Sequence, residues 1–452
     1  MRHLTRRSFL ASAAALTTAP ALAAPAPAPE VPRSGWVDAV VVGAGAAGIA
    51  AGRRLAAAGK RFVVLEAANE IGGRCITETR TFGVPYDRGA HWIYASDINP
   101  LMKLAPQAGV EIYAAPPGQR MRIGRRYARE GEMEDFLASL VRANTAIADV
   151  ARKSDIACTH ALPKDLGEWR PTVEFVLGPY GCGKELAEVS TADLSRAGER
   201  DNSAFCRQGF GTLLAKLAAS LPILPATPVK SIEWWSRARI EVDTPKGQFR
   251  TAAVILTVST NVLTSGKIKM APELPKRHLE AASKLKLGSR DHVALELIGN
   301  PLGLRSDELV FERTDSRQTA ALFGNMSGST ICVIDIGGSF GRDLSAKGDA
   351  AMIDFAINWL GGLYGTDMKN AVKRRHATRW NNEPWVLGAI SAAAPGAQSA
   401  RKILSEPISG RIFLAGEATH ETRWGTVNGA WESGERAADA VVKLLGGPSK
   451  RT

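Results

Sequence analysis

WVDAVVVGAGAAGIAAGRRLAAAGKRFVVLEA, residues 36–67, contains a strand, a glycine turn, a helix and a second strand in immediate succession. Apart from Asp38, Val37 to Val42 form an apolar run, which is typical of a parallel strand that is buried on both faces of its sheet. The alanine-rich helix that follows gives the strand–helix–strand unit of an α/β protein. The stretch therefore predicts a doubly covered, Rossmann-like sheet near the start of the chain.

The glycines of this stretch have the spacing of a dinucleotide-binding turn. Gly43, Gly45 and Gly48 form G-x-G-x-x-G directly after a strand and at the start of a helix, and Glu66 ends the second strand. Such glycines allow a tight turn, close approach of a pyrophosphate, and tight helix–strand packing, while the acidic residue accepts from ribose hydroxyls. We therefore predict that the cofactor contacts Gly43, Gly45, Ala47, Gly48, Glu66 and Ala67.

Two further segments predict close contact with the same cofactor. EAANEIGGRC (66–75) places Gly72, Gly73 and Arg74 where a second loop and a guanidinium reach the pyrophosphate. YDRGAHWIY (86–94) follows, and its Gly89 and Ala90 indicate a close approach to a flat ring, with His91 and Trp92 next to them. Near the end of the chain, a short strand runs into Gly416 and Glu417, and a helix begins after a second glycine cluster.

With these motifs in this order, the chain resembles the flavin amine oxidase family, which includes monoamine and polyamine oxidases. GAHWIYASDINPLMKLA (89–105) is most similar to the polyamine oxidase branch. The resemblance implies an FAD cofactor, with Gly416 and Glu417 at its ribityl chain and Thr426 and Val427 at the head of a helix under the flavin ring. It also implies contacts from the strand TPVKSIEWW (227–235) and the loop TRWNNEPWVLGAISAAAPG (378–396), namely Val229 at the adenine, Trp380 against the flavin, and Trp385.

The sequence departs from the family at three places. Covalent members attach FAD through a cysteine where this chain has Ala389, so we expect the FAD to be non-covalent. The two aromatic residues that frame the amine in monoamine oxidases fall near Ile390 and Thr426, so an aromatic cage is not expected there. A lysine near the reactive flavin nitrogen is replaced by His292, which with Trp380 is our candidate catalytic residue. Two interpretations of His292 stay open. It is either a neutral histidine satisfied in the core, or it lies near the flavin, where it orders a water or assists reoxidation of the flavin.

The resemblance implies two interleaved domains. We expect a Rossmann-like FAD domain and a substrate domain with a mixed sheet and helices. The FAD domain is expected in segments 36–95, 206–275 and 379–446, and the substrate domain in a helical part, 96–205, and a sheet part, 276–378. Before them lie a predicted twin-arginine signal peptide (1–23), marked by Arg6, Arg7 and an apolar run, and a Pro/Ala linker (24–35).

Composition limits the remaining function classes. The formal charge of +12 is spread along the chain without the aromatic-interleaved pattern of a nucleic-acid module, so no nucleic-acid partner is expected. Five cysteines show no C-x-x-C or Cys/His zinc spacing, which predicts no metal site; buried thiols are the default, with a bridge such as Cys158 to Cys182 left open. The export signal predicts a periplasmic protein that uses the Tat machinery, with no stable membrane anchor.

The expected reaction is FAD-dependent oxidation of a small-molecule amine to an imine, which hydrolyses to an aldehyde, with dioxygen as electron acceptor and hydrogen peroxide as product. Three alternatives stay open from the sequence. They are a flavin dehydrogenase or desaturase of the same fold, an L-amino-acid oxidase, which needs an arginine clamp for a carboxylate, and a non-catalytic flavin-fold binding protein. The sequence names neither the amine nor the oligomeric state.

Overall fold

The computed structural model describes residues 34–198, 202–365 and 367–446. The predicted signal peptide, residues 1–23, and nearly all of the predicted linker lie outside these ranges. Within them, no helix is both long enough and apolar enough to cross a membrane.

The first sheet is built from three separated segments of the chain. Its order is β13-β10-β11-β12-β1-β2-β9, and β19 pairs with the C-terminal half of β12. The pairs around β1 are parallel, whereas β10, β11 and β12 form an antiparallel meander. The strands are β1 (Gly35–Val42), β2 (Phe62–Leu65), β9 (Ile223–Leu224), β10 (Ser231–Glu233), β11 (Ile240–Thr244), β12 (Gly247–Leu256), β13 (Lys269–Ala271) and β19 (Ile412–Leu414).

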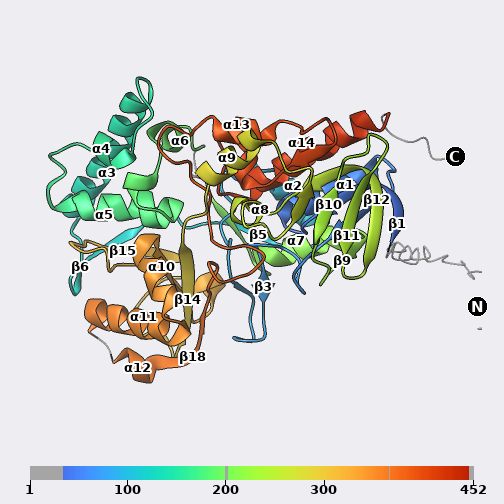
Figure 1. Ribbon diagram of the computed structural model, residues 1–452. Helices are drawn as coiled ribbons and strands as arrows, with labels where there is room; N and C mark the ends of the chain where they lie inside the picture. The colour runs from blue at the N-terminus through green and yellow to red at the C-terminus, as the bar shows by residue number, and fades with distance from the viewer. Residues whose placement is uncertain (1–33, 199–201, 366, 447–452) are drawn as a thin grey trace, which may run out of the picture.

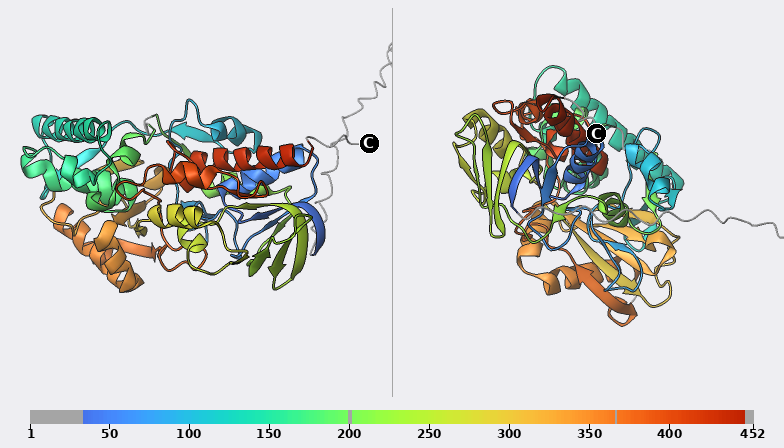
Figure 2. Two further views of the ribbon diagram at one scale, coloured as in Figure 1. Left: turned by 45° about the horizontal axis from the view of Figure 1, so that its top comes forward. Right: turned by 90° about the vertical axis from the view of Figure 1, so that its right-hand side faces the viewer.

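Helices cover both faces of this sheet, as the apolar run of β1 from residue 39 to residue 42 predicts. Ala39 and Val41 join the core on one face, and Val40 and Val42 join the core on the other. On the first face α14 lies beside α1 (Figures 1 and 2), and a Cβ at Gly434 would stand 2.0 Å from the Ala47 carbonyl oxygen. The helices of these layers are α1 (Ala46–Ala57), α2 (Pro100–Gln107), α7 (Phe210–Ala218), α8 (Thr260–Leu263), α9 (Lys276–Lys284), α13 (Ala400–Ser405) and α14 (Val427–Leu444).

The second sheet has the order β18-β14-β17-β16-β15-β6-β7 and is mainly antiparallel. Val293 and Leu295 of β14 pack on one face, which helices α10 (Gly338–Ala346) and α11 (Asp349–Tyr364) cover. The opposite face carries Ala294 and Val333 and is turned toward the first sheet's loops. The strands are β6 (Arg120–Ile123), β7 (Arg126–Tyr127), β14 (Arg290–Leu297), β15 (Glu308–Glu312), β16 (Ala321–Gly324), β17 (Ile331–Gly337) and β18 (Val372–Ala377).

A helical layer packs at the far end of the molecule from the β1–β12 pair (Figure 1). Its longest member, α3, begins at Glu130 and ends at Ala151, and it buries Phe136, Ala143 and Ile147. The smaller helical elements of the chain are α4 (Cys158–Ala161), η1 (Gly167–Trp169), α5 (Arg170–Phe175), the π-helical turn η2 (Val176–Tyr180), η3 (Leu186–Glu188), α6 (Thr191–Ser195), η4 (Met326–Gly328), α12 (Met368–Ala371) and η5 (Glu417–Thr419). Two small antiparallel pairs of strands complete the fold, β3 (Thr77–Glu78) with β4 (Tyr86–Asp87) and β5 (Ile112–Ala114) with β8 (Ala204–Cys206).

Three features differ from the expected division of the chain. Helix α2, in the segment expected to belong to the substrate domain, buries Leu101 and Ala105 in the core of the first sheet. The segment 96–205, expected to be helical, also supplies β6 and β7, because the turn at Gly124 lets two short strands extend the second sheet. Helix α9, expected in the substrate half, buries Ala281 and Ala282 in the core of the first sheet and packs against α13. Residues 276–284 therefore pack with the first sheet rather than with the second.

Candidate active site

One cavity of about 1000 Å³ lies where the loops of the first sheet meet the free face of the second. This volume is at the upper end of the range for ligand sites in proteins. Every residue predicted to bind the cofactor or to take part in catalysis lines it, except Gly48. Gly48 is buried instead, and a Cβ there would stand 1.8 Å from the Gly43 carbonyl oxygen, so this glycine permits the close helix–strand packing.

The glycine loops form one end of the cavity, here called the dinucleotide end. Gly43 has φ +105°, and a Cβ there would meet the Thr257 hydroxyl at 2.5 Å. Gly45 bridges to Gly72 of the second glycine loop, and helix α1 starts at Ala46 without a side-chain cap. The first amides of α1 therefore remain available for an anion in the cavity, as a dinucleotide phosphate requires.

Glu66 stands at the rim of this end and is 7% exposed. Its carboxylate accepts hydrogen bonds from the amides of Ala44 at 2.6 Å and Ala68 at 2.8 Å. Burial raises its pKa above the ordinary value, and these amide bonds oppose the shift. These bonds leave lone pairs on the carboxylate, and the contact with ribose hydroxyls stays a prediction.

Glu417 lines the middle of the cavity, but its oxygens are already bonded to the protein. Oε1 accepts from the Arg74 guanidinium at 2.9 Å, while Oε2 accepts from the Ser391 hydroxyl at 2.6 Å and from the Gly425 amide at 2.8 Å. Burial opposes ionisation, yet the positive charges of Arg74 and Arg401 hold the pKa of Glu417 below its ordinary value. The carboxylate thus fixes the groups around it, rather than pointing a free oxygen at a ligand.

The N-terminus of α14 points into the same part of the cavity. Thr426 caps the helix by accepting from the Gly429 amide at 3.0 Å. Val427 and Ala430, in its first turns, line the cavity together with Thr426. An electron-rich ring that lay here would face the positive end of an 18-residue helix.

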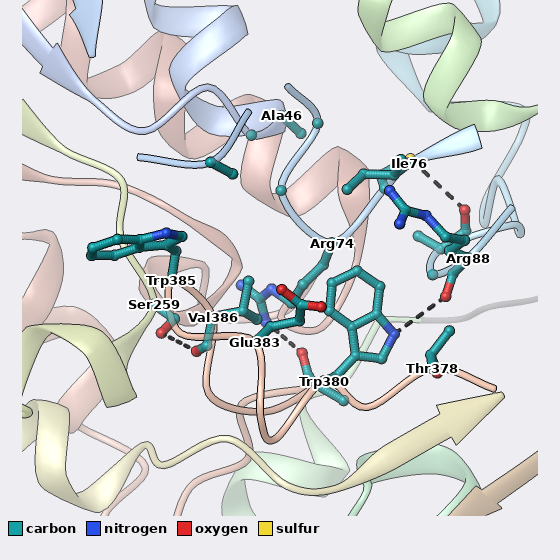
Figure 3. A pocket seen from close by; sticks show the side chains of 18 of the residues that line it. Ala46, Arg74, Ile76, Arg88, Ser259, Thr378, Trp380, Glu383, Trp385 and Val386 are labelled. Atoms are coloured by element: carbon teal, nitrogen blue, oxygen red, sulfur yellow. Dashed lines mark hydrogen bonds between the residues drawn. The ribbon is translucent and has the colours of Figure 1, made fainter. Parts of the chain in front are cut away.

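The loop after β18 contributes two tryptophans (Figure 3). Trp380 is 7% exposed, and its indole N–H donates to the Arg88 carbonyl at 3.2 Å. Its ring stands against Gly89, where a Cβ would come within 3.1 Å of it. Trp385 is 36% exposed and carries the Lys267 ammonium group 5.4 Å from its ring centre.

Charged side chains from β14 and β17 form the opposite end of the cavity, here called the sheet end. His292 lies directly across the ladder from Asp335, and its Nε2 is 3.1 Å from the Asp335 carboxylate. Arg290 donates to the same carboxylate at 3.0 Å. Burial lowers the pKa of His292, although Asp335 opposes the shift.

His91 lines this end from the loop after β4. Its Nδ1 donates to Asp87 at 2.7 Å, and Asp87 also accepts from the Phe210 amide at the start of α7. The His91 ring stacks on Phe205 with centroids 4.6 Å apart. The histidine that the sequence places beside a flat ring is therefore held by a buried carboxylate.

Aromatic side chains are present near the sheet end, but they do not occupy the two positions where monoamine oxidases carry their aromatic pair. Ile390 and Thr426 line the cavity and bring no aromatic ring there. Trp92 instead lies 5.4 Å from Phe323 and stacks on Tyr94 with centroids 6.2 Å apart. All three of these aromatic residues line the cavity.

The five cysteines are all buried free thiols in the structure. Cys75 lines the cavity, but burial raises the pKa of its thiol well above the usual range, which disfavours the reactive thiolate. Ala389 lies where a tether is expected in covalent relatives, and its carbonyl accepts from Arg74. Within the part of the chain that the structure describes, no cluster of three or more histidine, cysteine or acidic residues could hold a metal ion.

The sequence did not point to Arg290, to Asp335, or to the buried ion pair between helices α13 and α6. Arg401 on α13 donates to both oxygens of Asp193 on α6, at 2.6 and 2.7 Å, and both side chains are fully buried. Arg401 also donates to Ser391, which in turn bonds Glu417. The usable signal was an ionisable residue inside an apolar strand, as Asp335 is in TICVIDIG (330–337).

Residues 46–442 match the family described as flavin containing amine oxidoreductase, and this chain belongs to that family. The match spans most of the chain, so the family, the α/β fold and FAD as the cofactor are confirmed as predicted from the sequence. The family match confirms that the protein is an FAD-dependent amine oxidoreductase.

Solved structures share the fold. Cyclohexylamine oxidase from Brevibacterium oxydans superimposes with a TM-score of 0.75 at 20% identity, covering 91% of this chain and 99% of the other. Wild-type putrescine oxidase bound to putrescine superimposes with a TM-score of 0.76 at 18% identity, covering 90% of this chain and 99% of the other. Among curated relatives, lysine-specific histone demethylase 1B of Mus musculus is 28% identical over 89% of this chain, and the chain spans 52% of that protein's length.

Proposed function

We propose that this protein oxidises the C–N bond of a small-molecule amine, using non-covalently bound FAD and dioxygen. The amine would give an imine that hydrolyses to an aldehyde and ammonia or a smaller amine, and each turnover would consume one dioxygen and release one hydrogen peroxide. The chemistry that FAD supplies when bound is acceptance of a hydride from the carbon next to the nitrogen and return of the electrons to dioxygen. Support comes from the family and from a cavity that combines a dinucleotide end with a charged, aromatic end.

The residues of the cavity fit FAD in three respects. The uncapped start of α1, at Ala46, suits the pyrophosphate, and Glu66 at the rim suits a ribose. The backbone of Gly45 has room on its cavity side, since a Cβ there would meet nothing closer than 3.8 Å in the protein. The start of α14 and the Trp380 ring bound the space expected for the flavin.

One observation favours an amine over an amino acid as the substrate. Among the described residues, each arginine that lines the cavity is already paired with a carboxylate: Arg74 with Glu417, Arg80 and Arg88 with Glu70, Arg290 with Asp335, and Arg379 with Asp349. No guanidinium is thus left over to clamp a substrate carboxylate. The aromatic faces of Trp92, Tyr94 and Phe323, which line the cavity, suit a cation better.

The proposal is tested with the purified, FAD-loaded protein and a panel of polyamines, monoamines and L-amino acids. Anaerobic bleaching of the flavin absorbance reports oxidation of each compound, and a peroxide-coupled assay in air reports the use of dioxygen. We expect amines to bleach the flavin and release peroxide, and amino acids to do neither. Bleaching by amino acids alone would overturn the substrate class, and bleaching without peroxide would make the protein a dehydrogenase.

A further inference from the structure

A buried ion pair lies behind the wall of the cavity, between helices α6 and α13. Arg401 donates to both carboxylate oxygens of Asp193, at 2.6 and 2.7 Å, and both side chains are fully buried. Neither residue lines the cavity. Burial of two charges is costly, and such a pair can often be replaced by apolar residues without loss of stability. Stability alone therefore gives little reason for this pair, and its other hydrogen bonds show what else it holds.

The other hydrogen bonds of Arg401 end at the loop 389–393 and at η5. Its guanidinium donates to the Ser391 hydroxyl at 3.0 Å, to the Ser391 carbonyl at 3.3 Å and to the Ala418 carbonyl at 3.2 Å. Because a guanidinium only donates, the Ser391 hydroxyl must accept from Arg401. Its single proton is then left for Glu417, whose Oε2 lies 2.6 Å away. Arg401 thus sets the direction in which Ser391 donates.

Asp193 fixes the same loop at its far end and a second loop as well. Its Oδ2 accepts from the Ala393 amide at 2.8 Å, and its carbonyl accepts from the Trp424 indole N–H at 3.3 Å. The centre of the Trp424 ring lies 4.7 Å from the Arg401 guanidinium carbon. Trp424 directly precedes Gly425, which lines the cavity. Two loops that are distant from α6 in the sequence are therefore held by one ion pair.

Glu417 carries these contacts to the wall of the cavity. Its Oε1 accepts from Arg74 at 2.9 Å and its Oε2 accepts from the Gly425 amide at 2.8 Å, and all three residues line the cavity. Although burial opposes ionisation, the positive charges of Arg74 and Arg401 hold the pKa of Glu417 below its ordinary value. The carboxylate is therefore charged at neutral pH and holds Arg74 in place.

Arg74 is the member of this network that a ligand in the cavity can reach (Figure 3). Its side chain is 28% exposed. One nitrogen, Nη1, donates both to Glu417 and to the Ala389 carbonyl. Within the described residues its Nε and Nη2 groups make no hydrogen bond, so these donors are available to the anionic pyrophosphate of FAD.

We propose that Arg401, Asp193 and Ser391 are positioning residues for FAD, although none of the three lines the cavity. They act through Glu417, which holds the guanidinium of Arg74 in the orientation that binds the cofactor. This role requires FAD as the cofactor, which the family match gives, and it does not depend on the substrate proposed above. Helix α6 thereby contributes to the affinity for FAD from outside the cavity.

The first test separates the affinity for FAD from the stability of the fold. Arg401→Met combined with Asp193→Leu replaces the ion pair by apolar side chains and should regain most of the stability that Arg401→Met alone loses. Because Ser391 still lacks its donor, we expect the dissociation constant of FAD to rise by about tenfold, the effect of one hydrogen bond to a charged group. Flavin fluorescence on serial dilution of the FAD-loaded protein measures this constant. Recovered stability together with wild-type affinity would assign the pair to structure alone and overturn the proposal.

Ser391→Ala tests the same path with the ion pair intact, and it does not depend on recovery of the double variant. Loss of the hydroxyl should again raise the dissociation constant of FAD by about tenfold. Added to the double variant, it should bring little further rise, because Arg401 acts through Ser391. Unchanged affinity in Ser391→Ala, or full additivity of the two effects, would overturn the proposal.

Arg120→Met is the matched control, because it breaks an ion pair away from the cavity. Arg120 donates to Glu308 at 3.0 Å, the Glu308 side chain is 6% exposed, and neither residue lines the cavity. This variant should unfold at a lower urea concentration and bind FAD as the wild type does. An equal rise of the FAD dissociation constant in the control and in Ser391→Ala would mean that FAD release follows general stability, against the proposal.

Two further outcomes separate this proposal from the proposed function. FAD that stays with the denatured wild-type chain would overturn non-covalent binding, and the positioning roles with it. Failure of every amine to reduce the flavin would overturn the proposed function alone, because FAD release from the variants is measured without any substrate.

Discussion

The two ends of the cavity are built in different ways. The dinucleotide end uses backbone: Gly43, Gly45 and the start of α1 lie within a few consecutive residues. The sheet end uses side chains from strands that are distant in sequence, and its geometry depends on the register that sets His292 opposite Asp335. A site made of backbone follows from local sequence, whereas a site made of cross-strand side chains exists only after the whole sheet has formed.

The largest effect should come from the backbone of the dinucleotide end. A Cβ at Gly48 would stand 1.8 Å from the Gly43 carbonyl oxygen, and neither backbone can move without separating α1 from β1. We expect Gly48→Ala to lose more than about 5 kcal/mol, so that little folded protein is recovered. Yield and circular dichroism of the purified variant measure this. A stable, FAD-loaded variant would show that the turn is less constrained than the structure indicates.

Gly45→Ala is the matched control, three residues away in the same motif. Its Cβ would meet no protein atom closer than 3.8 Å, and Gly45 has an ordinary φ of −78°. The FAD-free protein should therefore unfold at the same urea concentration as the wild type. The added methyl group should instead weaken FAD binding, measured as the FAD lost on gel filtration. Equal FAD retention in the two proteins would mean that the pyrophosphate does not approach this backbone.

The next largest effect should come from the buried ion pair between helices α13 and α6. Arg401 and Asp193 are fully buried, and Arg401→Met would leave the Asp193 carboxylate without its cation. Removal of one partner of such a pair costs about 3–5 kcal/mol, and Asp193→Leu in the same chain should recover much of it. Urea unfolding measures both variants. Arg54→Ala, which breaks an exposed pair with Asp439, should change stability by less than about 1 kcal/mol.

The sequence predicted which segments meet at the dinucleotide end of the cavity, since the strand, turn and helix that shape it are contiguous; the contacts with FAD stay predictions. At the sheet end it predicted His292 from a family pattern but missed Arg290, two positions away, and Asp335. No local rule pairs β14 with β17, and the register comes from packing of both faces of the sheet. The hydrogen-bond partners of Glu417 were likewise out of reach, because Arg74 and Ser391 come from distant segments; its place at the ribityl chain stays a prediction.

The smallest effect concerns Asp291, the neighbour of His292 on the opposite face of β14. Burial raises the pKa of Asp291 to about 6, although it accepts from the Trp380 amide at 2.7 Å and from the Thr378 hydroxyl at 3.1 Å. Because this pKa lies above the value near 3.9 of an unfolded chain, the folded protein binds more protons between about pH 4 and pH 6. Its contribution to the free energy of unfolding is therefore greatest below pH 4 and is lost as the pH rises to about 6.

Asp291→Asn should remove this pH dependence, because the amide is neutral and its oxygen can still accept from Trp380. Above pH 6 the variant should be more stable than the wild type by up to about 3 kcal/mol, and below pH 4 the two should converge. Urea unfolding at intervals between pH 4 and pH 7.5 measures the difference, in which the contributions of other buried acids cancel. Parallel curves would mean that Asp291 is ionised at little cost.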